Sequence, residues 1–159
     1  GCTLTGMRLS ARLTERQRAL QKFIEILVNL KGQMCGLGIP LVDAFENIGK
    51  ENTSGVWSEI FMRCSGIMRE EHVNAGKAWR KALENDRNLC LDELDYLQIR
   101  DFGERLGKSD RYNQEKVLEL EKEKISIMER KAREDMETKG KLYRSLGILT
   151  GAAVVVLLI

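Results

Sequence analysis

The sequence predicts an all-α protein: an antiparallel bundle of about six helices, with long first and last helices, flanked by membrane segments. Hydrophobic residues recur at steps of three and four, as in amphipathic helices, and the alternation typical of strands is absent. One proline in 159 residues and an aromatic content of 6% also argue against a β-sandwich. The chain ends in an uncharged apolar run, residues 146–159, which is the main indication of a membrane segment.

The first two helices are expected over residues 7–37 and 41–48. An apolar stripe at helical spacing supports the first helix. Pro40 has the fixed φ that suits the first position of a helix, so we expect it to open the second. The side chains expected to face the core from these two helices are Phe23, Ile24, Leu27, Leu30, Met34, Leu41, Ala44, Phe45 and Ile48.

Three further helices are expected, each after a residue whose side-chain oxygen suits an N-cap: Ser54, Asn74 and Asp92. The sixth helix begins near Ser109 and runs without a proline to the apolar end of the chain. Residues of opposite charge three or four positions apart support its middle. Trp57 and Trp79 are expected in the core rather than on a partner-binding surface, because large aromatic side chains dominate core packing.

The C-terminal run, residues 146–159, is interpreted as the start of a membrane segment. It is shorter than the ~20 residues that a spanning helix needs, so a buried core helix is the alternative. Its Gly, Ala and Val content and the absence of a turn before it favour the membrane interpretation. Residues 1–7 are interpreted in the same way, as the end of a truncated N-terminal membrane segment. Residues 8–145 between them form the helical bundle.

Basic residues flank both apolar ends on the side of the bundle. Such residues mark the cytoplasmic side of a membrane and attract anionic lipid. We therefore expect a cytoplasmic bundle whose basic end binds anionic lipid, with an ordinary solvated basic face as the alternative. The membrane-proximal basic residues are Arg8, Arg12, Arg16, Arg18, Lys139, Lys141 and Arg144.

No motif in the sequence points to catalysis, a cofactor or a metal. The single histidine, His72, is expected in a loop. The four cysteines lack the C-x-x-C spacing of zinc and redox sites, so free thiols are expected. Gly107-Lys108-Ser109 is similar to the end of a phosphate loop, but Phe102 stands where its first glycine belongs. The net charge of +2 argues against a nucleic-acid partner. We expect a protein that is not an enzyme.

The two ends of the bundle are expected to differ in role. At about 1.5 Å per residue, the first helix carries the chain roughly 45 Å from its start, and the last helix returns over a similar distance. The basic clusters therefore share the membrane end. The loops at residues 36–40 and 106–111 share the opposite, distal end, where a cytoplasmic partner is expected to dock.

Four stretches of the chain resemble the stage III sporulation protein AB family, in order over nearly the whole sequence. The most specific is F-G-E-x-L-G-x-x-D-R-x-x-Q, residues 102–114. The weaker matches are Ile39-Pro40-Leu41-x-x-Ala44, Ala78-Trp79 and Tyr143-x-Ser145-Leu146-Gly147-x-Leu149-x-Gly151. The family also implies a complete first membrane helix, of which residues 1–7 are expected to be the end.

The resemblance implies a non-enzymatic membrane platform component of the channel that links mother cell and forespore in endospore-forming bacteria. The family is distantly similar to the F-domain platform proteins of type II secretion, which couple a hexameric cytoplasmic ATPase to the assembly. The implied partners are the ATPase, stage III sporulation protein AA, and other sporulation channel proteins. The implied location is the mother-cell membrane around the forespore, the outer forespore membrane, with the bundle facing the mother-cell cytoplasm. The alternative is a soluble cytoplasmic adaptor with a buried C-terminal helix.

Five residues of the matching element are candidates for partner binding at the distal turn: Glu104, Gly107, Asp110, Arg111 and Gln114. Asp110 is expected to cap the sixth helix, and Gly107 to close the fifth in a left-handed conformation. Arg111 is expected to pair with Glu104 across the turn. These residues fix the turn or line a partner-binding groove, and the two interpretations are compatible.

Overall fold

The computed structural model describes the backbone of residues 2–51, 55–86 and 89–158. The side chains of residues 2–7, 9–10, 111, 140, 143–144, 146–147 and 150–158 lie outside the description. The elements are α1 (Cys2–Lys31), the π-helical turn η1 (Gly32–Gly36), α2 (Leu41–Lys50), α3 (Trp57–Glu71), α4 (Ala75–Glu84), α5 (Glu93–Lys108) and α6 (Arg111–Leu158). No strand occurs in the described ranges, which confirms the predicted all-α class.

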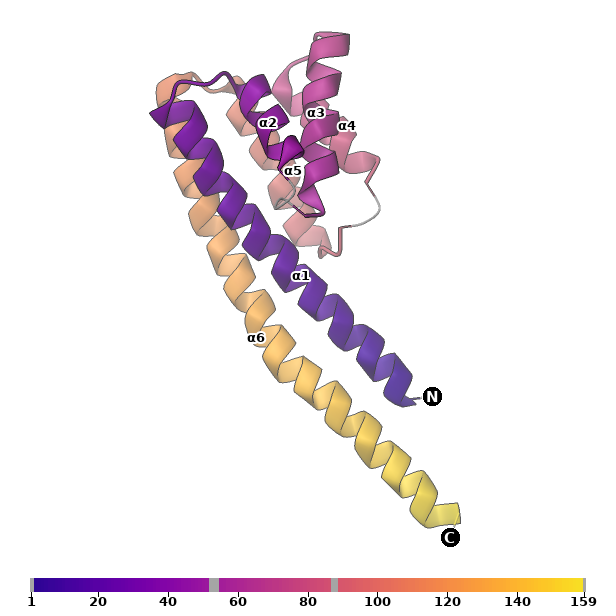
Figure 1. Cartoon of the computed structure of the whole chain (residues 1–159). Coiled ribbons are helices and arrows are strands. Elements are labelled where there is room, and N and C mark those ends of the chain that lie inside the picture. Colours follow the sequence, from indigo (N-terminus) through magenta and orange to yellow (C-terminus); the bar gives the residue numbers. More distant parts are fainter. Residues whose placement is uncertain (1, 52–54, 87–88, 159) are drawn as a thin grey trace.

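The long helices α1 and α6 pack against each other in antiparallel fashion along most of the molecule (Figure 1). The N- and C-termini therefore lie toward the same end, with α6 extending beyond the start of α1. At the other end, Lys31 at the end of α1 lies 3.9 Å from Glu115 and 2.5 Å from Glu119, near the start of α6. The predicted return of the last helix beside the first is confirmed.

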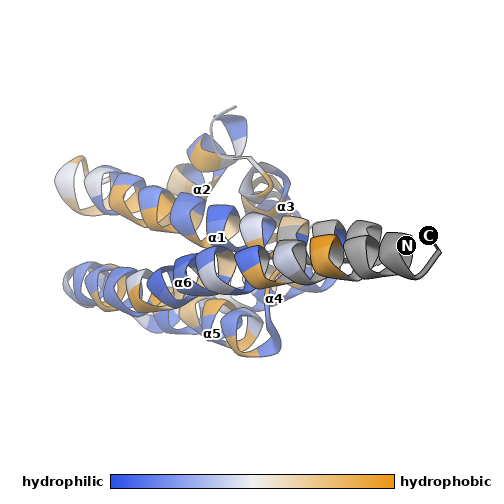
Figure 2. Ribbon diagram, turned by 90° about the horizontal axis from the view of Figure 1, so that it is seen from below, coloured by the Kyte–Doolittle hydropathy of each residue, from blue (hydrophilic) through white to orange (hydrophobic). Residues whose placement is uncertain are grey.

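The four short helices pack on one part of this helix pair. In chain order α2 packs on α3, α3 on α4, and α4 on α5, which returns to α6. Viewed from below, the two long helices lie in front, with α2 and α3 on the side of α1 and α5 on the side of α6 (Figure 2). The four helices thus cover the half of the pair that is far from the termini.

The core is an aromatic cluster contributed by five helices. Its fully buried members are Phe23, Phe45, Trp57, Phe61, Trp79 and Phe102. Phe23 lies 4.6 Å from Trp57 and 5.7 Å from Phe102 between ring centroids, within the range of favourable aromatic contacts. Each indole N–H donates to a backbone carbonyl, Trp57 to Ala19 (2.9 Å) and Trp79 to Ile99 (2.8 Å). The predicted core role of both tryptophans is confirmed.

The helix starts follow local capping rules. The Asn74 side chain accepts a hydrogen bond from the Lys77 amide (2.8 Å), and Asp92 forms a capping box with Asp95, so both predicted caps are confirmed. Pro40 is the residue before α2 rather than its first helical residue. The third candidate cap, Ser54, lies outside the described residues.

The first helix differs from its prediction at both ends. It begins at Cys2, and after Lys31 it continues as the π-helical turn to Gly36, in which Met34 is buried. Among the described residues, no helix is long and apolar enough to cross a bilayer. The expected membrane segments, residues 1–7 and 146–159, fall mostly on side chains outside the description.

Candidate docking site at the distal end

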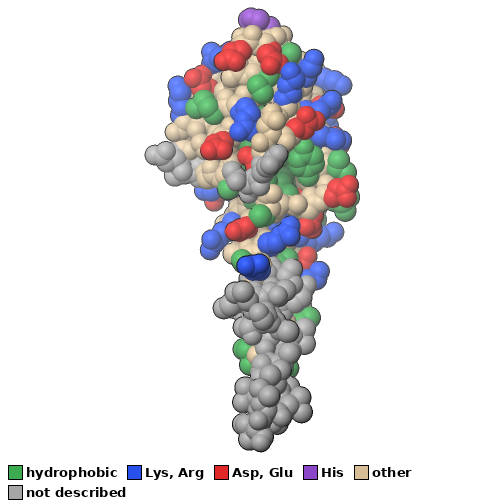
Figure 3. All heavy atoms as spheres, turned by 90° about the vertical axis from the view of Figure 1, so that its right-hand side faces the viewer, with side chains coloured by type: hydrophobic (Ala, Val, Ile, Leu, Met, Phe, Trp, Pro, Cys, Tyr) green, Lys and Arg blue, Asp and Glu red, His purple; other side chains and the backbone are tan. Residues whose placement is uncertain are grey.

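Three chain turns form the end of the molecule opposite the termini, here called the distal end: residues 37–40, 72–74 and 109–110. His72 lies in the second turn, with a left-handed φ of 54°, and is the purple side chain at the top of Figure 3. The predictions that His72 lies in a loop and that the loops after the first and fifth helices share one end are both confirmed.

Asp110 caps α6, as predicted. Its Oδ1 accepts a hydrogen bond from the Asn113 amide (2.8 Å), and its carbonyl accepts one from the Gln114 amide (2.8 Å). The Gln114 side chain reaches back 3.5 Å to the carbonyl of Leu106 at the end of α5. A carboxylate at this position also interacts favourably with the helix dipole. Asp110 and Gln114 thus hold the α5–α6 turn in its conformation.

The prediction for Gly107 was wrong. Gly107 is not left-handed, because α5 continues through it to Lys108. Its role is close packing: a Cβ at Gly107 would lie 3.0 Å from Cβ of Ala75 and 3.0 Å from the amide nitrogen of Gly76, both on α4. The missing side chain therefore lets α4 and α5 approach each other at the distal end.

Glu104 has a partner on α4 that the sequence interpretation missed. It forms an ion pair with Arg80, and both side chains are partly exposed. The expected partner, Arg111, begins α6, but its side chain lies outside the described residues. Glu104 therefore ties α5 to α4.

The rest of the matching element also joins α5 to its neighbours. Phe102 and Leu106 are fully buried, and a Cβ at Gly103 would overlap the ring of Trp79. These contacts support the interpretation that residues 102–114 fix the local structure. Part of the open surface that remains lies on the side of α4.

That open surface is a groove between α4 and α5, here called the α4–α5 groove. It has a volume of about 450 Å³ and is lined by Asn74, Gly76, Lys77, Arg80, Glu104, Gly107 and Lys108. Two of the predicted docking residues, Glu104 and Gly107, are in it, and three cations join them. Sequence reasoning missed these cations because they come from two helices whose pairing is not visible in a local pattern.

The basic residues predicted at the membrane end do not all have the same environment. Arg8, Arg12 and Arg18 on α1 and Lys139 and Lys141 on α6 are exposed. The side chain of Arg144 lies outside the described residues.

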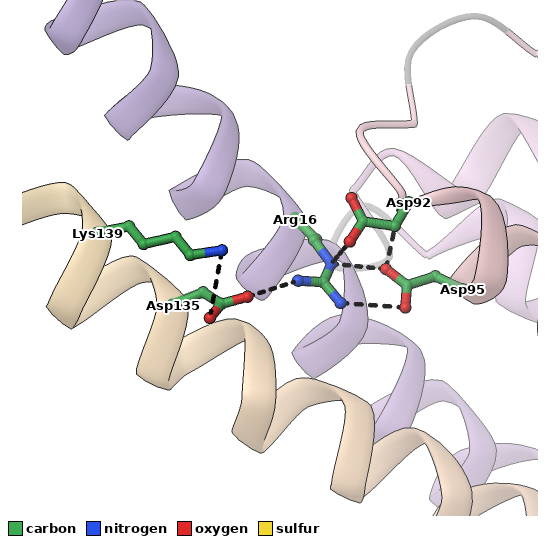
Figure 4. A network of polar contacts seen from close by, with 5 residues as sticks. All are labelled: Arg16, Asp92, Asp95, Asp135 and Lys139. Carbon is green, nitrogen blue, oxygen red and sulfur yellow. Dashed lines mark hydrogen bonds and ion pairs between the residues drawn. The ribbon is translucent and has the colours of Figure 1, made fainter. Parts of the chain in front are cut away.

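Arg16 differs from these residues because it is the centre of an ion network (Figure 4). Its Nε lies 2.6 Å from the buried Asp95 and 3.4 Å from Asp92, and its Nη1 lies 3.5 Å from Asp135 of α6. The hydrogen bond to Asp95 raises the pKa of Arg16 above its ordinary value. Arg16 thus joins α1, α5 and α6, and its side chain is turned toward the protein rather than toward solvent.

Within the described residues, no group of three or more His, Cys, Asp or Glu side chains is arranged to hold a metal. Cys64 and Cys90 are free thiols, as predicted, and Cys2 is outside the description. Burial raises the pKa of Cys64 to about 12. The thiol of Cys90 donates to Glu15 (2.9 Å), and this bond raises its pKa as well. Neither thiol is activated as a nucleophile.

The described residues define an all-helical protein built on a long antiparallel helix pair. Exposed basic residues lie at one end of the pair, and three chain turns form the other end. A family model described as stage III sporulation protein AB matches residues 1–159, and the chain belongs to this family. Stage III sporulation protein AB of Bacillus subtilis (strain 168) is 29% identical over 157 residues, covering 98% of this chain and 91% of that protein. No solved structure matches the chain. The family gives the chain a role in sporulation.

Proposed function

We propose that the chain is a non-enzymatic membrane platform component of the channel between mother cell and forespore, and that it docks a cytoplasmic secretion-type ATPase, stage III sporulation protein AA. In this proposal it lies in the mother-cell membrane around the forespore and faces the mother-cell cytoplasm. Membership of the stage III sporulation protein AB family supports the sporulation context.

The observation that carries the proposal is the separation of the two ends. The termini lie at one end of the helix pair, while the turns 37–40, 72–74 and 109–110 lie at the other (Figure 1). A protein held in a membrane through its termini would present these turns farthest from the bilayer. The exposed basic residues of α1 and α6 near the termini would then meet anionic lipid.

The test is binding of the purified chain to the ATPase, compared between the wild type, Asp110→Arg and Asp110→Asn. Asparagine caps a helix about as well as aspartate, so Asp110→Asn keeps the turn and removes its charge, while Asp110→Arg also loses the cap. We expect the wild-type chain to bind the ATPase and Asp110→Arg to lose this binding. Circular dichroism should show that both variants are folded. An ATPase that does not bind the folded wild-type chain would contradict the docking proposal.

A further inference from the structure

Two glycines that line the α4–α5 groove let the helices approach closely and place no side chain in it. A Cβ at Gly76 would lie 2.9 Å from Cα of Glu104, and one at Gly107 would lie 3.0 Å from Cβ of Ala75. The floor of the groove is therefore helix backbone. Its walls are the long side chains of Lys77, Arg80, Glu104 and Lys108.

The groove carries an excess of unpaired positive charge. Its single carboxylate, Glu104, forms an ion pair with Arg80. Lys77 and Lys108 are exposed and form no ion pair with a carboxylate of the described residues. Some other surface lysines do have such partners, as Lys31 has Glu119 and Lys81 has Glu71. Two unpaired ammonium groups thus face one groove.

We propose that the α4–α5 groove binds an acidic segment of the protein that docks at the distal end. This inference rests on the proposed function and names the chemistry by which the partner is recognised. Complementary charge at an interface speeds association and fixes the register of the partner. Lys77 and Lys108 bind its carboxylates, while the Arg80–Glu104 pair holds the two helices at the spacing that keeps the groove open.

An acidic protein segment fits this surface better than a lipid headgroup does. The groove lies at the end opposite the termini, beside the turns 72–74 and 109–110. Lys and Arg side chains are interleaved with Asp and Glu on the upper face in Figure 3, so this face is not a continuous basic surface. Attraction to an anionic bilayer surface favours larger clusters, of about 4–8 Lys and Arg residues.

The test compares the double variant Lys77→Glu/Lys108→Glu with a matched control, Lys122→Glu/Lys131→Glu. The control changes the net charge equally, on exposed positions of α6 outside the groove. Binding is measured to the ATPase and, separately, to a short labelled poly-glutamate peptide. Arg80 is left unchanged because its substitution would also break the contact between α4 and α5.

We expect the groove variant to weaken binding of the ATPase and of the peptide by about tenfold or more, and the control to change neither beyond about twofold. The difference should narrow as salt is raised, since the Debye length is only about 8–10 Å near physiological ionic strength. Unfolding temperatures of both variants that equal the wild-type value exclude a loss of fold.

ATPase binding that is the same in the groove variant and in the control overturns the inference and leaves the proposed function standing. If the wild-type chain does not bind the ATPase, the proposed function fails, and binding of the poly-glutamate peptide becomes the only test of the inference. Peptide binding that depends on Lys77 and Lys108 then supports an acidic ligand. Absence of peptide binding, or capture of anionic vesicles by these two lysines in its place, overturns it.

Discussion

Glu121 of α6 is a buried carboxylate that the fold only partly satisfies. It is 1% exposed, and its Oε2 accepts a hydrogen bond from Gln98 of α5 (3.0 Å) and lies 3.4 Å from Arg105. Its Oε1 has no hydrogen-bond partner in the described part of the chain. Burial raises the pKa of Glu121 to about 7, because removal from water disfavours the charged form more than its partners favour it.

This raised pKa predicts that Glu121 makes the folded chain less stable as pH rises. Between the ordinary pKa of glutamate, about 4.3, and the folded value of about 7, the folded state holds a proton that the unfolded state has released. The contribution of Glu121 to the free energy of unfolding therefore falls with rising pH across this window and is constant above it.

Glu121→Gln removes the titrating group and should stabilise the chain at pH 8 by about 1–3 kcal/mol, an amount set by the size of the pKa shift. The gain should become small at pH 4, where the wild-type side chain is protonated in the folded state and mostly protonated in the unfolded state. Urea unfolding at several pH values measures this difference. Glu123→Gln, at an exposed position of the same helix, is the control, and a gain that does not depend on pH would contradict the prediction.

Gly103 determines how closely α5 approaches Trp79. Trp79 is fully buried, and its indole N–H is fixed by the carbonyl of Ile99. A methyl group at Gly103 would overlap its ring. Gly103→Ala should therefore lower the free energy of unfolding by about 1–3 kcal/mol or more, the usual cost of overpacking a core.

The matched control for Gly103→Ala is Gly66→Ala. Gly66 lies within α3, and a Cβ there would have no neighbour within 4 Å. Alanine at such a position should stabilise the helix by roughly 0.5–1 kcal/mol, because glycine loses more backbone entropy on folding. Chemical denaturation of the two variants should give shifts of opposite sign. Shifts of the same sign would mean that the contact with Trp79 is not what requires glycine.

At the scale of helices, Arg16 of α1 connects α1 to α5 and α6 near the start of α5. Arg16→Ala would leave the carboxylate of Asp95, 2% exposed, without its 2.6 Å partner. Removing one member of a buried pair costs about 3–5 kcal/mol, whereas Arg12→Ala, at an exposed position, should change stability by no more than ~0.5 kcal/mol. Thermal and urea unfolding test this contrast.

The double variant Arg16→Ala/Asp95→Asn checks that the ion network is the cause. Because the second change removes the charge that the first leaves buried, the double variant should be destabilised by less than the sum of the single variants. Additive effects would show that Arg16 stabilises the chain through packing of its aliphatic part alone.

Local rules predicted the helices well, and contacts between helices poorly. Asn74, Asp92 and Asp110 could be identified as caps because the bonds they make reach only three residues along the chain. The network of Arg16 could not, because Asp95 is 79 residues away, and the sequence does not reveal which arginine of a basic run turns inward. The same reason explains why the sequence indicated the distal turn but missed Lys77 and Lys108.

Gly107 shows why a local pattern gave the wrong conformation. A glycine near the end of an expected helix indicates a left-handed cap, and the pattern alone offers no sign that the helix continues. The packing of Gly107 against Ala75 of α4 depends on which helices are neighbours. That information lies in the tertiary arrangement and not in the local sequence.

At the scale of the whole molecule, the antiparallel pairing of α1 and α6 separates two groups of exposed basic residues. Arg8, Arg12, Lys139 and Lys141 of the long helices are exposed toward the termini, and Lys77 and Lys108 lie at the distal end. The fold therefore has two basic surfaces at a distance from each other, which the small net charge of +2 does not reveal. Their separate roles in the proposals above can be tested by removing the same charge from each.

Neutralisation at the end near the termini, Arg8→Gln/Arg12→Gln, should weaken binding of the chain to vesicles that contain anionic lipid. Each basic residue near such a surface contributes about 1 kcal/mol, so the pair should cost on the order of 2 kcal/mol, an effect that high salt suppresses. Neutralisation at the distal end, Lys77→Gln/Lys108→Gln, removes the same charge and should leave vesicle binding unchanged. Co-sedimentation with vesicles of increasing anionic content measures both. Equal losses from the two ends would mean that lipid responds to net charge alone, and the proposed orientation, with the termini toward the membrane, would then have no support from lipid binding.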